Sequence, residues 1–383
     1  MNVDWLIYSG SVGTGAAGLQ SNVASVRYRM LVPMQALQSS GHEMRIVNID
    51  ADTAKSTVAN ALAGEVIVIS KIMAPSVEAF SRLSEATFDV VAGARVRGQR
   101  VIADVSDNHF EHPIFGAHFR SLVNEVDLVV ASTPGMAGII AQHTPRPIQV
   151  ISDPYEGPRG VVRFAPPAQR TRGLFKQTVR ALFRREAAHA KLRLLWFGHG
   201  SNLDTLVDAI PEVTRLAARY IVNLHVVTAE QTNAAKLCET LTEAHAPLCT
   251  FHFSPWSAQT TWRALEACDV VIIPSKVNDS RKSIKSPNRL IEGLWAGRLV
   301  CSHPLPSYEE FRSYAWVGAD LVAGIEESIA NAASARRKIA AGQEYVAAHY
   351  SPAAIGRAWE AALRGATVDE ALLRRPATEG TCA

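Results

Sequence analysis

One segment in the second half of the chain combines charge, hydrogen-bonding groups and a helix start. An apolar run over 269–274 predicts a buried strand, and the polar stretch 275–286 that follows predicts a loop. The next helix is expected over 287–296, with Ser286 as its N-cap and Pro287 as its first residue. The free N–H groups and the positive dipole end of such a helix favour an anion, so the segment predicts a phosphate site.

Several side chains around this helix start are suited to a nucleoside diphosphate. The cations are Lys276, Arg281, Lys282, Lys285 and Arg289. Glu292 lies about one and a half turns into the helix, where its carboxylate can accept hydrogen bonds from both hydroxyls of a ribose. The alternative is a solvated basic loop in which Glu292 pairs with Arg289, one turn earlier. That alternative explains the charges, but it does not explain the order of cap, proline, glutamate and glycine at a strand end.

A second group of polar residues follows the apolar run 100–104. Asp104, Asp107, Asn108 and His109 share one short loop. Ligands of open α/β sheets bind outside the carboxyl ends of the strands, so this loop is a candidate binding site in the first half of the chain. Two roles stay open for His109, one in binding or catalysis and one in the structure alone.

The strands and helices that would position these groups alternate along the chain. Apolar runs of strand length occupy 5–9, 44–49, 65–70, 100–104, 128–132, 148–152, 192–197, 222–228, 249–253, 269–274 and 298–302. Helical spacing of apolar residues occupies 25–40, 76–97, 134–143, 203–220, 231–243, 257–268 and 287–296. Strands that are apolar throughout are typical of parallel sheets covered on both faces. The predicted fold class is therefore α/β, with two Rossmann-like, doubly wound parallel-sheet domains that face each other across a cleft.

Five segments are expected within this organisation. Residues 1–165 would form an N-terminal, acceptor-side domain, and residues 192–345 a C-terminal, donor-side domain. The boundary falls in a stretch rich in proline and arginine, as is usual for linkers. The basic linker or helix 166–191 would join the domains, the helix 346–365 would return to the first domain, and 366–383 would form a frayed tail.

The motif Gly13-Thr-Gly15-Ala-Ala-Gly18 matches the GxGxxG pattern of dinucleotide-binding loops and follows a predicted strand. The full fingerprint also requires an acidic residue about 20 positions further on. The first acidic candidate, Asp50, comes more than 30 residues after Gly18. We therefore expect a long, flexible glycine loop at the ligand edge. In that loop Gly13 and Gly15 would let backbone N–H groups approach a ligand, and Arg27 from the next helix would meet an anion.

The composition excludes several classes of protein. The chain has 383 residues, 48% of them hydrophobic and 20% charged, which is typical of a globular protein of two or more domains. No apolar run reaches the roughly 18 residues of a membrane span, and no signal-peptide pattern opens the chain. Five cysteines without CxxC spacing argue against a disulfide framework and a zinc site. The net charge of +3 says little about partners. We expect no metal, no nucleic-acid partner and, from the cysteines, a cytoplasmic location.

Residues 173–193 carry a local excess of positive charge. Apolar residues at helical spacing alternate there with arginines and lysines, which predicts a basic amphipathic helix. Such a helix would dock peripherally at the inner, anionic face of a membrane, or it would pack between the domains with its basic face in water. The sequence favours neither interpretation.

The stretch from Lys285 to Val300, K-S-P-N-R-L-I-E-G-L-W-A-G-R-L-V, resembles the donor-binding signature of GT-B glycosyltransferases. The best match is to the retaining, family-4-like branch. Further pieces resemble the same family in the same order, and together they cover most of the chain. They are the helix from Ser25 with Gly41-His42, the strand 126–132, the strand end Trp196-Phe-Gly198 and the C-terminal segment 350–359.

The resemblance implies roles for individual residues. His109 matches an active-site histidine near the transferring sugar, and Asp107 would orient it or hold an acceptor hydroxyl. Trp256 would flank a base or sugar, or serve as a hydrophobic lid or core contact. The residues assigned to the nucleotide and donor are Lys276, Asp279, Arg281, Lys282, Lys285, Ser286, Asn288, Arg289, Glu292, Gly198 and Trp256.

The sequence departs from the family pattern at two places. A second glutamate, eight positions before the ribose-binding one, usually contacts the donor sugar, and here that position is Ile284. The basic pair that follows the first donor-domain strand is replaced by His199-Gly-Ser-Asn. The diphosphate charge would then fall to the cations of 276–289, and Asp279 would contact the sugar.

These features predict a metal-independent, retaining glycosyltransferase of the hexosyl type. It would move a sugar from a UDP- or GDP-linked donor to a carbohydrate or lipid-linked acceptor in surface polysaccharide or glycoconjugate synthesis. The resemblance implies that the leaving phosphate takes the acceptor proton, while the protein positions groups and stabilises charge. No permanently bound cofactor is expected. The alternatives are a nucleotide-sugar epimerase, a dinucleotide oxidoreductase that uses the glycine motif, and a non-catalytic nucleotide-sugar-binding protein.

Overall fold

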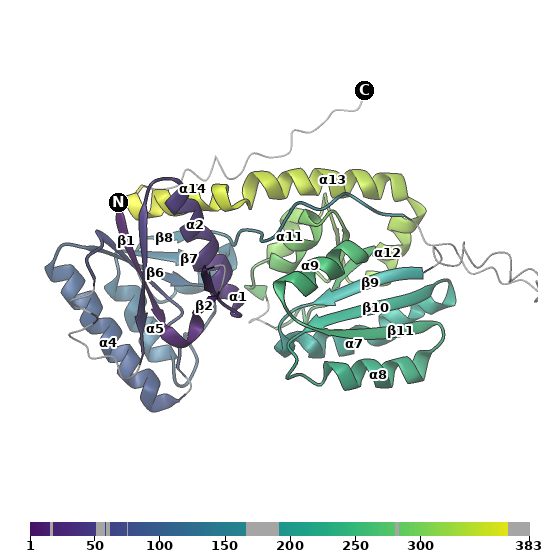
Figure 1. Cartoon of the computed structure of the whole chain (residues 1–383), viewed down its shortest axis with the longest axis horizontal. Helices are drawn as coiled ribbons and strands as arrows, with labels where there is room; N and C mark the ends of the chain where they lie inside the picture. The colour runs from purple at the N-terminus through teal and green to yellow at the C-terminus, as the bar shows by residue number, and fades with distance from the viewer. Residues whose placement is uncertain are drawn as a thin grey trace, which may run out of the picture. The chain divides into compact units, whose positions relative to one another are not determined.

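A computed structural model describes the chain except for residues 16–17, 51–57, 59–61, 75, 166–190, 280–282 and 367–383. The chain divides into two compact units (Figure 1). Unit 1 comprises Met1–Pro154, Ile284–Ser286 and Ala348–Ala383, and unit 2 comprises Tyr155–Ser283 and Pro287–Ala347. The division thus follows Pro154, whereas the sequence places the domain boundary at residue 165.

Unit 1 is built on a parallel sheet of six strands. The strands are β1 (Asn2–Tyr8), β4 (Glu43–Ile49), β5 (Val66–Ser70), β6 (Arg100–Val105), β7 (Leu128–Ala131) and β8 (Ile148–Val150). They lie in the order β4-β1-β5-β6-β7-β8, and every neighbouring pair is parallel. The order reverses between β1 and β5, so the carboxyl ends of these strands flank the place where such sheets bind ligands.

Helices cover both faces of this sheet (Figure 1). One face carries α4 (Val77–Val96), α5 (Gly116–Glu125) and α6 (Pro134–Ile140), and the other carries α2 (Val32–Ser39) and α14 (Pro352–Arg364). Neighbouring strand residues point to opposite faces, so Leu6 packs with the first group of helices and Trp5 with the second. This double cover explains why the strands are apolar throughout.

Unit 2 repeats the architecture with a different strand order. Its strands are β9 (Lys191–Phe197), β10 (Ile221–Thr228), β11 (Cys249–Pro255), β12 (Val270–Ile273), β13 (Leu299–Ser302) and β14 (Trp316–Val317). The parallel order β11-β10-β9-β12-β13-β14 places the reversal between β9 and β12. Two Rossmann-like parallel-sheet domains, as predicted from the sequence, are therefore confirmed.

The helices of unit 2 also divide between two faces. The first group is α7 (Leu203–Thr214), α8 (Ala234–His245), α12 (Leu321–Ala330) and α13 (Ala332–His349). The second group is α9 (Ala258–Ala267) and α11 (Asn288–Trp295). Because α11 connects β12 to β13, its N-terminus lies at the carboxyl end of β12, beside the reversal of strand order.

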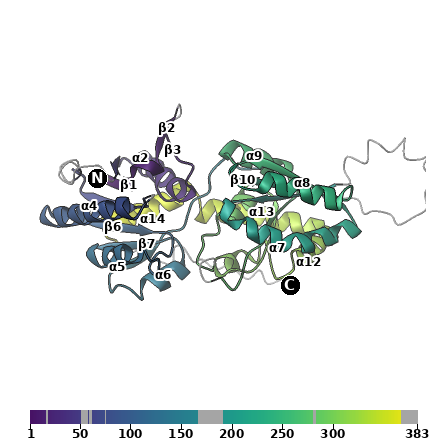
Figure 2. The ribbon, with the colours of Figure 1, turned by 90° about the horizontal axis from the view of Figure 1, so that it is seen from below.

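The glycine motif forms a hairpin, so the prediction of a flexible glycine loop is wrong. β2 (Gly13–Gly15) and β3 (Gly18–Gln20) pair antiparallel, with Gly13 opposite Gln20. Figure 2 shows this hairpin projecting from the rest of unit 1. The next helix, α1 (Ala24–Val26), begins only after the hairpin, so the glycines do not form the tight turn into a helix that dinucleotide binding requires.

The start of α11 also differs from the prediction, because Ser286 is not its cap. Pro287 occupies the N-cap position, the helix begins at Asn288, and no side chain caps it. The N–H groups of Leu290 and Ile291 both bond to the Pro287 carbonyl, at 2.9 and 3.0 Å. The helix start is therefore closed by backbone hydrogen bonds, one residue later than expected.

The burial of Ile284 accounts for the position of Ser286. The Ile284 side chain is buried in the hydrophobic core of unit 1, and its carbonyl accepts a 2.8 Å hydrogen bond from Thr133 Oγ1. A Cβ atom built on Gly135 would lie 3.4 Å from Ile284 Cγ2, so glycine makes room for this side chain. Residues 284–286 are thereby held in unit 1, which removes Ser286 from the cap position.

A buried arginine ties together the strand ends of unit 1. Arg29 lies on the π-helical turn (Arg27–Leu31) that joins α1 to α2, and it is 2% exposed. Its Nη2 lies 2.6 Å from Asp104 Oδ1, and its Nη1 lies 3.0 Å from Asp153 Oδ1 and donates to the Ile151 carbonyl. One guanidinium thus joins the end of β6 to the chain segment that follows β8.

The same network extends across the sheet from Asp104. Its Oδ2 accepts a 3.1 Å hydrogen bond from Ser70 Oγ at the end of β5, and Ser70 Oγ accepts one of 2.8 Å from Trp5 Nε1. Burial raises the pKa of the Asp104 carboxyl, and the Arg29 charge opposes that rise. Arg29 itself stays protonated, because the two carboxylates raise its pKa despite burial.

The expected linker and tail are almost wholly outside the described residues, which resume at Lys191 and end at Ala366. The amphipathic helix predicted over 173–193 is therefore outside them up to residue 190. Among the described residues, no helix combines the length and the apolar character that crossing a membrane requires.

We predict that Arg29→Met lowers the free energy of unfolding by about 3–5 kcal/mol, because two buried carboxylates lose their counter-charge. Chemical denaturation monitored by tryptophan fluorescence measures this loss. Arg95→Met is the matched control, since Arg95 and its partner Glu125 are 58% and 46% exposed. Removing such an exposed pair costs at most about 1 kcal/mol. Equal losses for the two variants would contradict the role of the buried network.

Candidate functional site

The strand ends beside the reversal in unit 2 bring together Gly198, which follows β9, and Arg289 of α11. A Cβ atom built on Gly198 would lie 3.5 Å from Cδ and 3.7 Å from Nη1 of Arg289. Both distances are ordinary van der Waals contacts, so the Arg289 side chain lies directly against this glycine. The guanidinium therefore lies over the turn that leads out of the first strand of the unit.

Arg289 has hydrogen-bonding capacity that the protein does not use. Its Nη1 atom is buried, and no described residue bonds to it. A buried donor that lacks an acceptor costs roughly 1–3 kcal/mol, and more when it is charged. Native proteins retain few such groups, so Arg289 is a candidate to bind an acceptor of a ligand.

Two further buried polar atoms adjoin the same turn, and the sequence did not single them out. Trp196 Nε1 and Thr228 Oγ1 have no hydrogen-bond partner among the described residues, and both side chains are fully buried. A Cβ atom built on Gly198 would lie 3.9 Å from Trp196 Cζ2, and one built on Gly200 would lie 3.8 Å from Thr228 Oγ1. Unpartnered polar atoms are a property of packing, so no sequence signal could have identified them.

Glu292 lies on α11, one turn after Arg289. Its side chain is 4% exposed, and its Oε1 accepts a 2.9 Å hydrogen bond from the backbone N–H of Glu156. Trp295, further along the helix, stacks on Tyr155 with ring centroids 4.0 Å apart, and its Nε1 donates to the Gly157 carbonyl. The segment from Tyr155 to Gly157 is thus fastened to the helix that carries Glu292.

The other residues predicted for the nucleotide have varied positions. Lys276 is exposed and pairs with Asp204 at 2.7 Å and with Asp208 at 3.4 Å, both on α7. Asp279 lies in the turn after β12, and its backbone N–H bonds to the Lys276 carbonyl. Trp256 follows β11, where its backbone N–H bonds to the Thr228 carbonyl at 2.8 Å. Asn288 is the first residue of α11 and Ser286 belongs to unit 1, whereas Arg281 and Lys282 lie outside the described residues.

In unit 1 the loop after β6 forms an ion cluster around Asp107. Its Oδ2 lies 3.0 Å from Lys71 Nζ, and its Oδ1 lies 2.5 Å from Lys285 Nζ. Lys71 follows β5 with a φ of 49°, a left-handed conformation that costs an L-residue roughly 1–2 kcal/mol. Lys285 was predicted to bind phosphate, and the structure gives its ammonium group a carboxylate partner.

The electrostatics of this cluster keep Asp107 ionised. Burial by itself would raise the pKa of the carboxyl, but Lys71 and Lys285 outweigh it and hold the pKa well below its usual range. A carboxylate of such low basicity does not accept a proton at neutral pH. Its hydrogen bonds to the lysines make it a positioning group.

His109 lies beside this cluster in an aromatic environment. Its ring centroid is 5.0 Å from that of Phe119 and 5.8 Å from that of Phe115. Among the described residues, no hydrogen bond joins it to Asp107. Burial lowers the pKa of His109 to about 4, although the Asp107 charge opposes this shift. The imidazole is therefore neutral at pH 7 and can donate or accept a hydrogen bond.

The remaining predicted groups are placed by the hairpin and the helix that follows it. Gly13 and Gly15 lie on β2, and Arg27 donates from Nη1 to the Ser21 carbonyl at 3.2 Å.

The structure thus gathers Asp107, His109 and Lys285 in unit 1. It gathers Gly198, Arg289 and Glu292 in unit 2. Among the described residues, no group of three or more His, Cys, Asp or Glu side chains is arranged to hold a metal ion.

No protein-family model and no curated protein matches the sequence. Solved structures do match. HepE of Anabaena in complex with UDP aligns with a TM-score of 0.61 at 12% identity, over 95% of this chain and 100% of that chain. An α-glucosyltransferase in complex with UDP and a 13-mer DNA aligns with a TM-score of 0.60 at 10% identity, over 95% of this chain and 99% of that chain.

TarM aligns with a TM-score of 0.54 at 11% identity, over 78% of this chain. The chain spans about half the length of TarM, 54% of it. At such low identities these matches establish the architecture alone. The protein has the GT-B fold of two Rossmann-like domains that glycosyltransferases share.

We predict that the His109 ring titrates near pH 4 in histidine NMR spectra, whereas an unperturbed histidine titrates at 6.5. Because folding lowers this pKa, protonation favours the unfolded chain. The stabilisation from neutral His109 is complete above pH 6.5 and is lost as the pH falls towards 4. A midpoint near 6.5 would show that the ring is solvated. Burial also lowers the pKa values of His118 and His225 to about 4, so in His109→Gln one of the midpoints near pH 4 should disappear, which assigns it.

Proposed function

We propose that the protein is a glycosyltransferase that takes a sugar from a UDP-linked donor. The observation that carries this proposal is Arg289, whose buried Nη1 beside Gly198 has no partner among the described residues. A phosphate oxygen at the end of β9 would supply the missing acceptor, and arginine suits phosphate because its planar fork matches the oxygens. UDP is the nucleotide bound by HepE and by the α-glucosyltransferase, with which this chain shares its fold.

Unit 2 binds the nucleotide in this proposal. Arg289 and the positive dipole end of α11 hold the diphosphate, which compensates for the basic pair that is absent after β9. Glu292 accepts hydrogen bonds from the ribose hydroxyls. A carboxylate offers about four lone-pair sites, so the Glu156 N–H and a ribose can be bound together. The identity of the donor nucleotide as UDP, not GDP, is part of the proposal.

Unit 1 serves the acceptor and the transferred sugar. The bond between the anomeric carbon and the diphosphate oxygen breaks, and the acceptor oxygen forms the new bond to that carbon on the same face. The acceptor proton passes to the leaving phosphate oxygen, so the protein contributes position and charge stabilisation. His109, neutral at pH 7, hydrogen-bonds to the sugar or to the acceptor hydroxyl. The Asp107 ion cluster holds Lys71 and Lys285 in place beside it.

The retaining outcome, the hexose and the acceptor class rest on the resemblance of the sequence alone. We propose a carbohydrate or lipid-linked acceptor in surface polysaccharide or glycoconjugate synthesis. The proposed location is cytoplasmic, peripheral to the inner face of a membrane. Docking by residues 173–193 would be tested by co-sedimentation with anionic liposomes at low salt, where absence of binding would end that part of the proposal.

A second candidate function is nucleotide-sugar binding without turnover, and Ile284 favours it. Its side chain fills part of the core of unit 1, so it cannot contact a sugar as the family's glutamate does at this position. The two functions differ in one measurement. Binding together with slow hydrolysis of UDP-glucose, or with transfer to added sugars, supports the enzyme, whereas binding with no turnover supports the second candidate.

We predict that UDP raises the melting temperature in a panel of UDP, GDP, ADP, dTDP and CMP. A ligand that binds only the folded state stabilises it in proportion to the logarithm of its concentration above Kd, so the shift should grow without saturating. Differential scanning fluorimetry measures it. A panel with no shift at any concentration would overturn the proposed donor site.

Arg289→Ala and Glu292→Ala should each weaken UDP binding by roughly 1–3 kcal/mol, the scale of a lost charged hydrogen bond. Isothermal titration calorimetry gives the affinities. Arg263→Ala is the control, because Arg263 is an exposed arginine on α9 of the same unit. Glu292→Gln keeps the shape of the buried side chain and separates loss of charge from loss of packing. Unchanged affinity in Arg289→Ala would remove Arg289 from the diphosphate site.

A further inference from the structure

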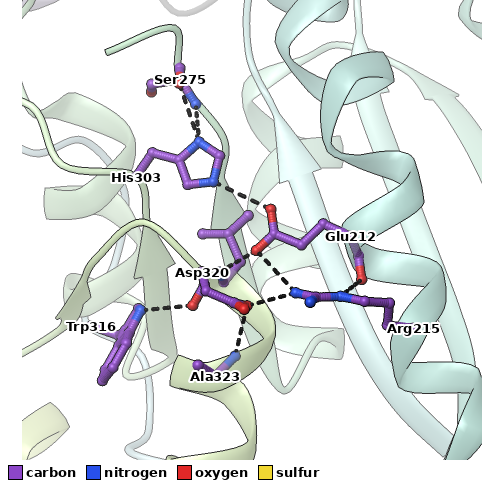
Figure 3. A network of polar contacts seen from close by, with 8 residues as sticks. Glu212, Arg215, Ser275, His303, Trp316, Asp320 and Ala323 are labelled. Carbon is purple, nitrogen blue, oxygen red and sulfur yellow. Dashed lines mark hydrogen bonds and ion pairs between the residues drawn. The ribbon is translucent and has the colours of Figure 1, made fainter.

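His303 connects Ser275, which follows β12, to helix α7 (Figure 3). It follows β13, and its Nδ1 lies 3.1 Å from the backbone nitrogen and 3.1 Å from the backbone oxygen of Ser275. Ser275 is near the carboxyl end of β12, in the loop that leads to α11. On the other side of the ring, Nε2 lies 3.4 Å from Glu212 Oε2 on α7. One imidazole therefore bridges two elements of unit 2.

The two contacts of Nδ1 with Ser275 need opposite states of the ring. A protonated Nδ1 can only donate, and its acceptor is then the Ser275 carbonyl. An unprotonated Nδ1 can only accept, and its donor is then the Ser275 N–H. Nε2 carries a proton in both states and donates it to Glu212. Gain of one proton by His303 thus replaces the Ser275 N–H with the Ser275 carbonyl as the partner of Nδ1.

Glu212 is held firmly enough to act on the ring. Its Oε1 accepts a hydrogen bond from the Leu321 N–H and lies 4.0 Å from Arg215 Nη2. Arg215 in turn pairs with Asp320 at 2.8 Å, and Asp320 caps α12 through the Ala323 N–H at 3.0 Å (Figure 3). The carboxylate that faces His303 is therefore held by the start of α12 and by Arg215, which follows α7.

The charged groups around His303 favour its protonated form. The hydrogen bond to Glu212 raises the pKa of the imidazole most, burial opposes it, and the Ser275 carbonyl and the Asp320 charge add to the rise. The cation Arg215 is paired with Asp320. The cation next in sequence to Ser275, Lys276, is paired with carboxylates of α7. The net effect is to raise the pKa of His303 above its ordinary value.

We propose that His303 is a positioning residue of the donor site, which sets the direction of the Ser275 backbone by exchanging its hydrogen bond between the Ser275 carbonyl and the Ser275 N–H. The inference rests on the proposed function only for the ligand. In the protonated state the Ser275 N–H is released at the strand end and the imidazolium adds positive charge. Both changes favour a diphosphate.

The proposal predicts the direction in which pH changes the stability of the protein and its affinity for the donor. The stabilisation from protonated His303 is complete below the pKa of the unfolded chain, about 6.5, and is lost as the pH rises through the higher pKa of the folded protein. Donor affinity should fall over that same upper range. UDP-glucose is the suitable probe, because its diphosphate carries no group that titrates near neutral pH.

The first test needs no ligand. NMR titration of the protein between about pH 5.5 and 8.5 should show the His303 ring titrating above 6.5 and the Ser275 amide shifting with the same midpoint. Glu212→Gln should lower both midpoints together, since it removes the charge and keeps the hydrogen bond. A Ser275 amide that stays constant through the His303 titration would overturn the exchange.

The second test measures UDP-glucose affinity across the same pH range. The affinity of the wild type should fall roughly two- to tenfold as the pH rises through the His303 midpoint, the scale of one hydrogen bond. His303→Asn, which keeps a polar group near Nδ1 but does not titrate, should flatten the profile. His252→Asn is the control, because His252 is exposed on β11 of the same unit. A wild-type profile in His303→Asn would overturn the proposal for the donor site.

The two tests fail separately. If UDP-glucose binds at no pH, the proposed function is wrong, and the titration of the Ser275 amide still decides whether His303 positions this strand end. If UDP-glucose binds with the same affinity at every pH while the Ser275 amide follows His303, the backbone exchange is real but has no part in donor binding, which overturns the assignment of His303 to the site.

Discussion

The buried guanidinium of Arg29 is the interaction on which unit 1 depends. Parallel strands end at one edge, so polar residues that follow them converge, and two carboxylates, Asp104 and Asp153, meet where water cannot solvate them. One arginine hydrogen-bonds to both, and the Oγ of Ser70 links Asp104 to the neighbouring strand. The loop with Asp107 and His109 leaves the sheet directly after this anchor. The position of this loop, on the proposed acceptor side, therefore depends on the buried ion pairs of Arg29.

The described cations that were predicted for the phosphate differ in whether the protein already supplies them with a partner. Lys276 and Lys285 each have carboxylate partners, as does Lys71. Arg289 alone among the cations predicted for the phosphate, so far as the described residues reach, has a buried nitrogen with no partner. A lysine that already bonds to a carboxylate gains less from a phosphate than an arginine whose buried Nη1 lacks an acceptor. This difference decides which positive charge is assigned to the donor.

Sequence patterns predicted the fold well because burial on both faces of a sheet leaves a direct trace in composition. The strands and most helices were found within a few residues, and the capping residues Ser76 and Ser257 mark the helix starts that were expected. Two local predictions were wrong, the flexible glycine loop and Ser286 as the cap of α11. The glycine motif is a hairpin, and Ser286 does not cap α11, because the burial of Ile284 in unit 1 overrides the local preference of serine before proline.

By itself, the sequence determined the two parallel sheets, the strand ends where polar residues gather, and the helix that carries Arg289 and Glu292. Periodicity and cap chemistry act between near neighbours in the chain, and they suffice for these features. Only the tertiary structure decided that Lys285 bonds to Asp107, that Arg289 lies over Gly198, and that His303 reaches Ser275. Each of these depends on residues far apart in sequence whose distances are set by packing, and packing is decided by the whole fold at once.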